Sequence, residues 1–305
     1  MKIQFLGTGA GVPSKHRNTQ SIVLNFMDEI KECFMIDCGE GTQHKMMYTN
    51  LKPAKITKIF ISHLHGDHIL GLIGFLSSRN FLLNKEKKDI YIFGPKGIKE
   101  YVTFNLKISS TVLNYNIHYK EFSKSNEILY DDKNINIESF KLIHGIESYA
   151  FKLNFKDKKG TLNVEKLKEI GIKPGKICRE IKEKDFFEFN GKKYISSKFL
   201  GEDKKGKKIV IISDTLYFSK LKDFIKDVDV LVSECTYLYP DEKILAKNHM
   251  HMNIEDINNL TQGEKIDKIY LTHISSRYDK KEIEDIKKSL KNNINLVNDM
   301  EEYEL

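Results

Sequence analysis

The stretch ISHLHGDHILGL, residues 61–72, places three histidines and one aspartate within six consecutive positions. The apolar run KIFIS that leads into it is short and rich in Ile and Phe, which is typical of a buried strand. The cluster is therefore expected where a strand ends and a loop begins, the place at which open α/β folds position their chemistry. Imidazole and carboxylate side chains bind transition metals, so this crowding indicates a metal site.

The order of the residues within the cluster indicates two metals rather than one. His63 and His65 are separated by one residue, and both can turn toward the same ion if the loop is tight, as Gly66 allows. Asp67 and His68 follow directly and are expected to face another direction. Two histidines alone on a loop are more often structural, but the added Asp and His favour the metal interpretation.

Further candidate ligands follow three other apolar runs. His144 stands in KLIHGIES, Asp214 in VIISDT and His273 in IYLTHIS. A single polar residue after an apolar run usually marks only the point where the chain leaves the core. Three such residues, in contrast, could supply the further ligands that two metal ions bound at the upstream cluster would require. Asp214 is the natural candidate for a carboxylate that bridges two cations. Two Zn²⁺ ions about 3.5–4 Å apart would lower the pKa of water to near neutral and stabilise an in-line phosphoryl displacement. A ligand set without thiolates suits catalytic zinc, with manganese as the alternative.

The elements that would position these ligands form a mixed α/β pattern. The first 150 residues alternate predicted strands with predicted helices over residues 39–51, 68–83 and 95–109, and the alternation resumes after residue 208. This pattern predicts an α/β sandwich of two halves. The 305 residues contain 40% apolar and 30% charged side chains, which is ordinary for a globular protein.

No run is apolar enough to cross a bilayer, and the start MKIQFLGTGAG lacks the apolar core of a signal peptide. The four cysteines form no CxxC pair, so we expect reduced thiols in a cytoplasmic protein without membrane contact.

The basic excess is confined to one segment. Residues 151–208 contain 18 Lys and Arg against 9 Asp and Glu, a net charge of +9, whereas the whole chain carries +7. Such a segment on a near-neutral body indicates contact with a polyanion, and a solvated lysine-rich surface is the plainer alternative. A hairpin turning at Asn190-Gly191 is expected within it. We expect residues 155–200 to form an inserted arm within a single domain of residues 1–305.

Several motifs resemble one family. The HxHxDH signature of the metallo-β-lactamase superfamily stands at residues 63–68, and nearly the whole chain resembles the short form of ribonuclease Z. The matching segments are FLGTGAGVPSKHRNTQSI, IDCGEGTQHKMM, IFISHLHGDHILGLIGFLSSR, IYIFGPKGIKEYV and LTHISSRY. The resemblance implies an αββα sandwich with a protruding tRNA-binding arm, two zinc ions per subunit and a homodimer. It also implies cleavage of precursor tRNA after the discriminator base, leaving a 3′-hydroxyl on the tRNA and a 5′-phosphate on the trailer.

The resemblance also implies roles for individual residues. The ligands of the first zinc would be His63, His65 and His144. Those of the second would be Asp67, His68 and His273, with Asp214 bridging both. Asp67 is similar to the proton acceptor of the family. His251, in HMHMN, resembles the histidine that assists at the leaving oxygen, with His249 as the alternative. Where the family has His-Ser-Thr or His-Met-Thr, this chain has His251-Met252-Asn253, so the role of the third residue is open.

Candidate RNA contacts lie in two places. In the loop GTGAGVPSKHRN these are Lys15 and Arg17. In the arm they are Lys173, Lys176 and Arg179, within IKPGKICREIK, which keeps Pro174-Gly175 but has Lys176 where the family has proline.

Two other functions are compatible with parts of this pattern. Another hydrolase of this fold, such as a lactonase or a small-molecule phosphodiesterase, would use the same seven ligands but would not explain a basic arm. The other is a non-catalytic RNA-binding protein whose metal site is structural or lapsed. A structural zinc usually has a closed shell of four ligands, often with cysteines, which this sequence does not offer.

Overall fold

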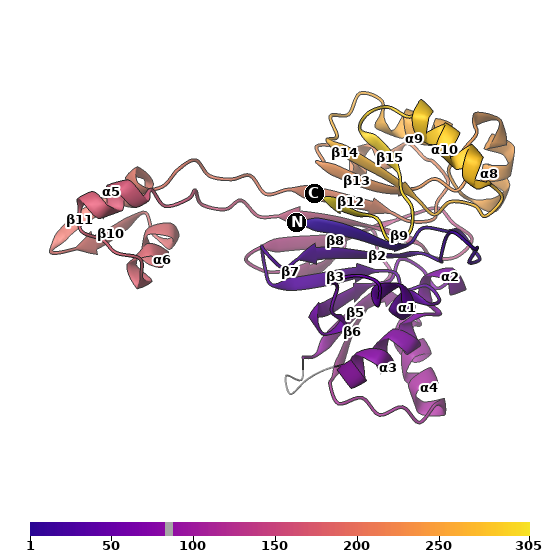
Figure 1. The fold of residues 1–305 in the computed structure, drawn as a ribbon, viewed down its shortest axis with the longest axis horizontal. Coiled ribbons are helices and arrows are strands. Elements are labelled where there is room, and N and C mark those ends of the chain that lie inside the picture. The colour runs from indigo at the N-terminus through magenta and orange to yellow at the C-terminus, as the bar shows by residue number, and fades with distance from the viewer. Residues whose placement is uncertain (83–87) are drawn as a thin grey trace.

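Two seven-stranded sheets form the centre of the molecule. The computed structural model describes residues 1–82 and 88–305. The first sheet has the order β16-β1-β2-β3-β4-β5-β6 and the second the order β15-β14-β13-β12-β9-β8-β7. Helices cover the outer face of each sheet, with α1, α3 and α4 on one side and α8, α9 and α10 on the other (Figure 1). The predicted αββα sandwich is confirmed.

The strands of the first sheet are β1 (Lys2–Gly7), β2 (Ser21–Phe26), β3 (Glu32–Ile36), β4 (Ile56–Phe60), β5 (Ile90–Pro95), β6 (Ile117–Phe122) and β16 (Glu302–Glu304). Those of the second are β7 (Ile128–Asp131), β8 (Ile135–Lys141), β9 (Tyr149–Phe155), β12 (Lys208–Ile212), β13 (Val230–Glu234), β14 (Lys268–Thr272) and β15 (Ile294–Leu296). The covering helices are α1 (Thr42–Met46), α2 (Gly66–Ile69), α3 (Leu72–Leu82), α4 (Ile98–Ile108), α7 (Lys220–Phe224), α8 (Lys243–His249), α9 (Ile254–Thr261) and α10 (Lys280–Ser289).

Three hydrophobic layers hold the sandwich together. Between the sheets lie aromatic side chains such as Phe60, Phe151 and Tyr270, all at most 1% exposed. A second layer fills the space between the first sheet and helices α1, α3 and α4, and a third lies under α7, α9 and α10. Because the central strands are buried on both faces, their sequences read as continuous apolar runs rather than alternating ones. No described helix is long and apolar enough to cross a membrane.

The helix predicted over residues 68–83 is two helices, α2 and α3, and residue 83 lies outside the described residues. The break falls at Gly71, whose N–H donates to the Cys38 carbonyl oxygen at 3.0 Å. A Cβ atom at Gly71 would lie 1.9 Å from the Gly39 carbonyl oxygen, so only glycine allows this approach. A tertiary contact therefore divides a stretch that is helical by its local pattern.

Two other predicted helices are shorter in the structure. The helix predicted over 39–51 is only α1, and the one predicted over 95–109 is α4, because Pro95 ends strand β5 instead of opening the helix.

Residues 156–207 project away from the sandwich between the neighbouring strands β9 and β12 (Figure 1). Two extended segments form the stalk, bridged at Lys158–Lys204 and Leu162–Leu200. At its end lie α5 (Val164–Glu169), α6 (Lys176–Glu183) and the hairpin β10 (Phe186–Phe189) and β11 (Lys192–Ile195). The hairpin turns at Asn190 and Gly191 with φ of 51° and 72°, as expected for this residue pair. These elements enclose a small core of their own. We call residues 156–207 the arm.

Candidate metal centre

The candidate ligands converge where strands of both sheets end. Strand β4 leads into the loop of His63 and His65 and into helix α2, β12 leads to Asp214, and β14 leads to His273. His144 follows β8 on the neighbouring loop. Because β12, β13 and β14 are parallel, their carboxyl ends lie at one edge of the sheet.

Two groups of ligand atoms share one carboxylate. The first group is His63, His65, His144 and Asp214. The second is Asp67, His68, Asp214 and His273. Within each group the ligand atoms lie within 4.8 Å of one another. Oδ2 of Asp214 is 3.5 Å from Nε2 of His63 and 3.3 Å from Nε2 of His273, so it lies between the two groups. The structure thus brings together all seven residues that the sequence indicated, in an arrangement compatible with two metal ions.

Burial and charge keep several of these groups in the protonation state that a metal requires. Burial lowers the pKa of His63 well below its ordinary value, and it also lowers the pKa of His144. Burial alone would raise the pKa of Asp214, but His273, His68 and His63 around it hold that pKa well below the ordinary value. At His68, in contrast, burial is outweighed by Asp214 and Asp37, which hold the pKa well above the ordinary value, so a metal bound there would displace a proton. Imidazole and carboxylate donors fit transition-metal ions such as Zn²⁺.

A second set of groups orients the histidine rings. Oδ2 of Asp37 is 2.8 Å from Nδ1 of His68, and this carboxylate also accepts hydrogen bonds from the backbone N–H and the hydroxyl of Ser62. Oγ1 of Thr236 is 2.9 Å from Nδ1 of His273. Each contact fixes a ring so that its Nε2 faces the candidate metal position. Asp37 was not singled out in the sequence, although it ends an apolar run in IDCGEG just as Asp214 ends one in VIISDT.

The backbone is strained at two of these positions. His273 and Asp37 have φ of 58° and 56°, in the left-handed region that side chains other than glycine rarely adopt. Such strain is found at sites where the surrounding structure imposes a particular side-chain direction.

His251 lies beside the ligand cluster and contacts a buried carboxylate. Its ring centroid is 5.1 Å from that of His144 and 5.3 Å from that of His273. Nδ1 of His251 is 3.1 Å from Oε1 of Glu234, which is fully buried. Burial would lower the pKa of His251, but the Glu234 carboxylate raises it to about 9. The contact with Glu234 therefore favours the protonated form of His251.

Glu234 itself was missed in the sequence, although it follows the apolar run VLVS at the end of β13. Its carboxylate also accepts hydrogen bonds from the backbone N–H groups of Thr215, Thr236 and Met252. The alternative residue, His249, lies on α8 and is in none of the described ligand clusters; its Nδ1 is 2.5 Å from the hydroxyl oxygen of Tyr237.

Comparison with known proteins identifies the family. A family model described as "Anti-Pycsar protein Apyc1" matches residues 1–159, so the first half of the chain belongs to that domain family. The chain is 47% identical over 287 residues to the ribonuclease Z of Oceanobacillus iheyensis, covering 94% of this chain and 93% of that protein. The chain belongs to the ribonuclease Z family. It is a hydrolytic endoribonuclease, as the resemblance implied.

Solved structures agree with this family and fold. The short form of human tRNase Z is 25% identical, covers 100% of this chain and 99% of its own, and superposes with a TM-score of 0.73. The metallo-β-lactamase fold protein YhfI from Bacillus subtilis is 17% identical over 99% of this chain and 98% of its own, with a TM-score of 0.67, and shows the fold alone.

The loop of Lys15 and Arg17 borders the metal centre. The backbone N–H of Gly11 donates to Oδ2 of Asp67 at 2.8 Å. Lys15 is exposed beside a pocket of about 360 Å³. Arg17, in contrast, is only 4% exposed, and its guanidinium donates to Thr8, to the Val297 carbonyl oxygen and to Asn298. The direct RNA contact predicted for Arg17 thus conflicts with its position, because the side chain is buried and three of its five N–H donors already bond to the protein.

The predicted RNA contacts of the arm lie on and beside α6. Lys173 and Lys176 are exposed, and so is Arg179, whose Nε donates to Glu183 at 2.8 Å.

Proposed function

We propose that this protein removes the 3′ trailer of precursor tRNA, cutting after the discriminator base. The observation that carries the proposal is the position of Asp214 between two groups of histidine and carboxylate ligands, beside His251 and its contact with the buried Glu234. The tRNA substrate follows from the solved relative named tRNase Z. We further propose that the first zinc would be held by His63, His65 and His144, the second by Asp67, His68 and His273, and both by Asp214. When bound, the two ions supply acidified water and neutralise charge on the phosphate.

Asp67 is proposed as the proton acceptor. Burial would raise its pKa, but His273 and His68 lower it well below the ordinary value, so the carboxylate is ionised. Its Oδ2 is 3.3 Å from Nε2 of His273 and accepts the hydrogen bond from Gly11, which holds it at the edge of the ligand cluster. It takes a proton from the attacking water as the new oxygen–phosphorus bond forms.

His251 is proposed as the proton donor to the leaving group. The bond that breaks joins phosphorus to the 3′ oxygen of the tRNA, and this oxygen needs a proton to leave as a hydroxyl. His251 carries that proton because Glu234 stabilises its charged form. The products are a 3′-hydroxyl on the tRNA and a 5′-phosphate on the trailer.

The arm is proposed to bind the body of the tRNA. Residues 156–207 contain 16 Lys and Arg against 9 Asp and Glu. The net charge of this segment is therefore +7, the same as that of the whole chain. Because neutralising phosphates releases counterions, this charge favours RNA on the arm over the rest of the surface. The sequence predicts the inserted arm of a single domain 1–305 at residues 155–200, and the projecting segment extends over residues 156–207. Its proposed RNA contacts are Lys173, Lys176 and Arg179, and Lys15 is the proposed contact near the metal centre.

Zinc, a homodimer and a cytoplasmic location complete the proposal. Imidazole and carboxylate ligands support zinc, with manganese as the alternative. Met47 and Phe81 are 78% and 85% exposed around an apolar pocket of about 500 Å³, a surface that a second copy would cover. The four cysteines are free thiols, which supports a reducing compartment.

The deciding experiment is cleavage of a 3′-extended precursor tRNA by the purified protein. Cutting after the discriminator base should require zinc, should stop with a chelator, and should be lost in Asp67→Ala but kept in Asp28→Ala, a change of an exposed carboxylate outside the site. Zinc-loaded protein that leaves the tRNA intact but turns over a small phosphodiester or lactone would overturn the tRNA proposal.

A further inference from the structure

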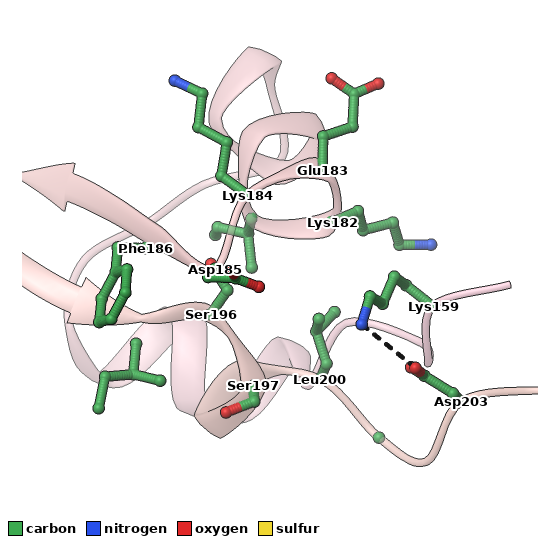
Figure 2. Close-up of a pocket in the computed structure, with 13 residues that line it drawn as sticks. Lys159, Lys182, Glu183, Lys184, Asp185, Phe186, Ser196, Ser197, Leu200 and Asp203 are labelled. Carbon is green, nitrogen blue, oxygen red and sulfur yellow. Dashed lines mark hydrogen bonds and ion pairs between the residues drawn. The ribbon is translucent and has the colours of Figure 1, made fainter.

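The end of the arm, formed by α5, α6, β10 and β11, contains a pocket of about 580 Å³. None of the residues that line it is part of the metal centre. The pocket is formed by the end of α6, the start of β10, the turn Ser196–Phe199 and the part of the stalk next to these elements (Figure 2). This volume lies in the range of pockets that hold small ligands. The chemistry proposed at the metal centre does not use this pocket.

The polar lining of the pocket mixes acidic and basic groups. Lys159 forms an ion pair with Asp203 at 3.2 Å. Lys182 and the carboxylate of Asp185 have no hydrogen-bond or ion-pair partner among the residues that the structure describes. In Figure 2 Asp185 lies between Phe186 and the Lys159–Asp203 pair. With carboxylates in the wall, a free phosphate alone is disfavoured, whereas a ligand that carries both hydrogen-bond donors and a phosphate matches the whole lining.

The rest of the lining combines polar side chains, those of Glu183, Lys184, Ser196 and Ser197, with apolar side chains and one aromatic ring. Phe186 is 49% exposed and Ile195 44% exposed, with Leu200 beside them in the lining. The Nζ of Lys193 lies 4.7 Å from the centre of the Phe186 ring. Exposed aromatic rings next to cationic side chains are the usual platform for unstacked bases of single-stranded RNA.

We propose that this pocket binds an unpaired guanosine of the RNA held by the arm, with the base against Phe186, its edge on Asp185 and a phosphate near Lys182. An ionised carboxylate only accepts hydrogen bonds, and guanine offers two adjacent donors, N1–H and the N2 amino group, that match its two oxygens. Adenine and cytosine each place an acceptor next to their amino group, which the carboxylate repels. The inference rests on the proposed function, because it assigns a base contact to the arm that is proposed to hold tRNA.

The test uses guanosine 5′-monophosphate as the probe and the full-length protein freed of metal by a chelator. Isothermal titration calorimetry should show saturable binding that is at least about tenfold tighter than that of adenosine 5′-monophosphate, since a matched pair of hydrogen bonds discriminates by this much or more. Asp185→Asn should lose this preference and shift toward adenosine monophosphate, because an amide presents one donor and one acceptor. Glu188→Gln removes a carboxylate of the same arm that does not line the pocket, and it should keep the preference.

A second pair of variants tests the phosphate contact. Lys182→Ala should weaken guanosine monophosphate more than guanosine, whereas Lys168→Ala, the same change on α5 outside the pocket, should not. Equal binding of the two monophosphates, or guanosine monophosphate binding unchanged in Asp185→Asn, would overturn the inference. Because these measurements need no cleavage, a failure here is distinguishable from a failure of the precursor-tRNA assay.

Discussion

The fully buried carboxylate of Glu234 lies 3.1 Å from Nδ1 of His251, at the edge of a cluster of metal-ligating side chains. Its oxygens also accept hydrogen bonds from three backbone N–H groups, so the carboxylate is fixed in place before any substrate binds. A fixed anion next to an imidazole stabilises the protonated ring. The position of Glu234 at the end of strand β13 therefore favours the protonated His251 that the proposed mechanism requires.

Replacing Glu234 by Gln should lower both activity and the pH at which activity is lost. The His251 proton is present below its pKa of about 9 and lost as the pH rises through that value, so the alkaline limb of the wild-type rate should lie near there. Without the carboxylate the pKa of His251 falls, and the alkaline limb should move to lower pH. Losing general-acid assistance should cost on the order of 10²-fold in kcat at neutral pH. Single-turnover cleavage across the pH range measures both effects.

The matched control is Glu255→Gln, on helix α9, whose carboxylate lies 3.7 Å from Nζ of Lys243. An unchanged pH profile in Glu234→Gln, with the same fall in rate at every pH, would contradict the proton-donor role of His251.

Removing the shared carboxylate should empty both metal positions. Asp214→Ala deletes a ligand from each group, so we expect bound zinc to fall from two ions per chain toward none. His65→Ala changes only the first group and should leave about one ion per chain. Inductively coupled plasma mass spectrometry of the desalted proteins measures the stoichiometry. Two tightly held ions in Asp214→Ala would show that this residue does not bridge the site.

Asp37→Asn should weaken metal binding without removing a ligand. The Asp37 carboxylate orients His68 and receives two hydrogen bonds from Ser62, so the amide would leave the ring less firmly held. Loss of such an orienting group costs about 10–100-fold in metal affinity. Competition with a chromophoric chelator measures the affinity, and Asp28→Asn, on the surface, should match the wild type.

Substitution of Lys15 should weaken RNA binding, whereas substitution of Arg17 should destabilise the fold. Lys15→Ala should raise KM for precursor tRNA and reduce the salt dependence of binding by about one phosphate contact, with unfolding unchanged. Arg17→Ala leaves buried acceptors unpaired, so it should reduce the free energy of unfolding by about 1–3 kcal/mol. Urea unfolding and salt-dependent binding curves distinguish the two. A normal urea midpoint in Arg17→Ala together with weaker RNA binding would restore Arg17 as a direct contact.

The sequence by itself was sufficient for the candidate ligands and for the architecture. His63 to His68 are close because they are adjacent in the chain, and His144, Asp214 and His273 could be recognised because each follows an apolar run. Strands that are buried on both faces must be apolar throughout, so their ends are visible in the sequence. The alternation of strands and helices then predicted the sandwich.

Only the tertiary structure decided which groups surround those ligands. Glu234 and Asp37 end apolar runs like many other residues, and their contacts with His251 and His68 join positions 17 and 31 residues apart. The inward direction of Arg17 depends on acceptors about 280 residues away, and the division of the 68–83 helix depends on the close approach of Gly71 to Gly39. Local patterns report which surface of an element is buried, whereas hydrogen bonds between distant segments exist only once the sheets have packed.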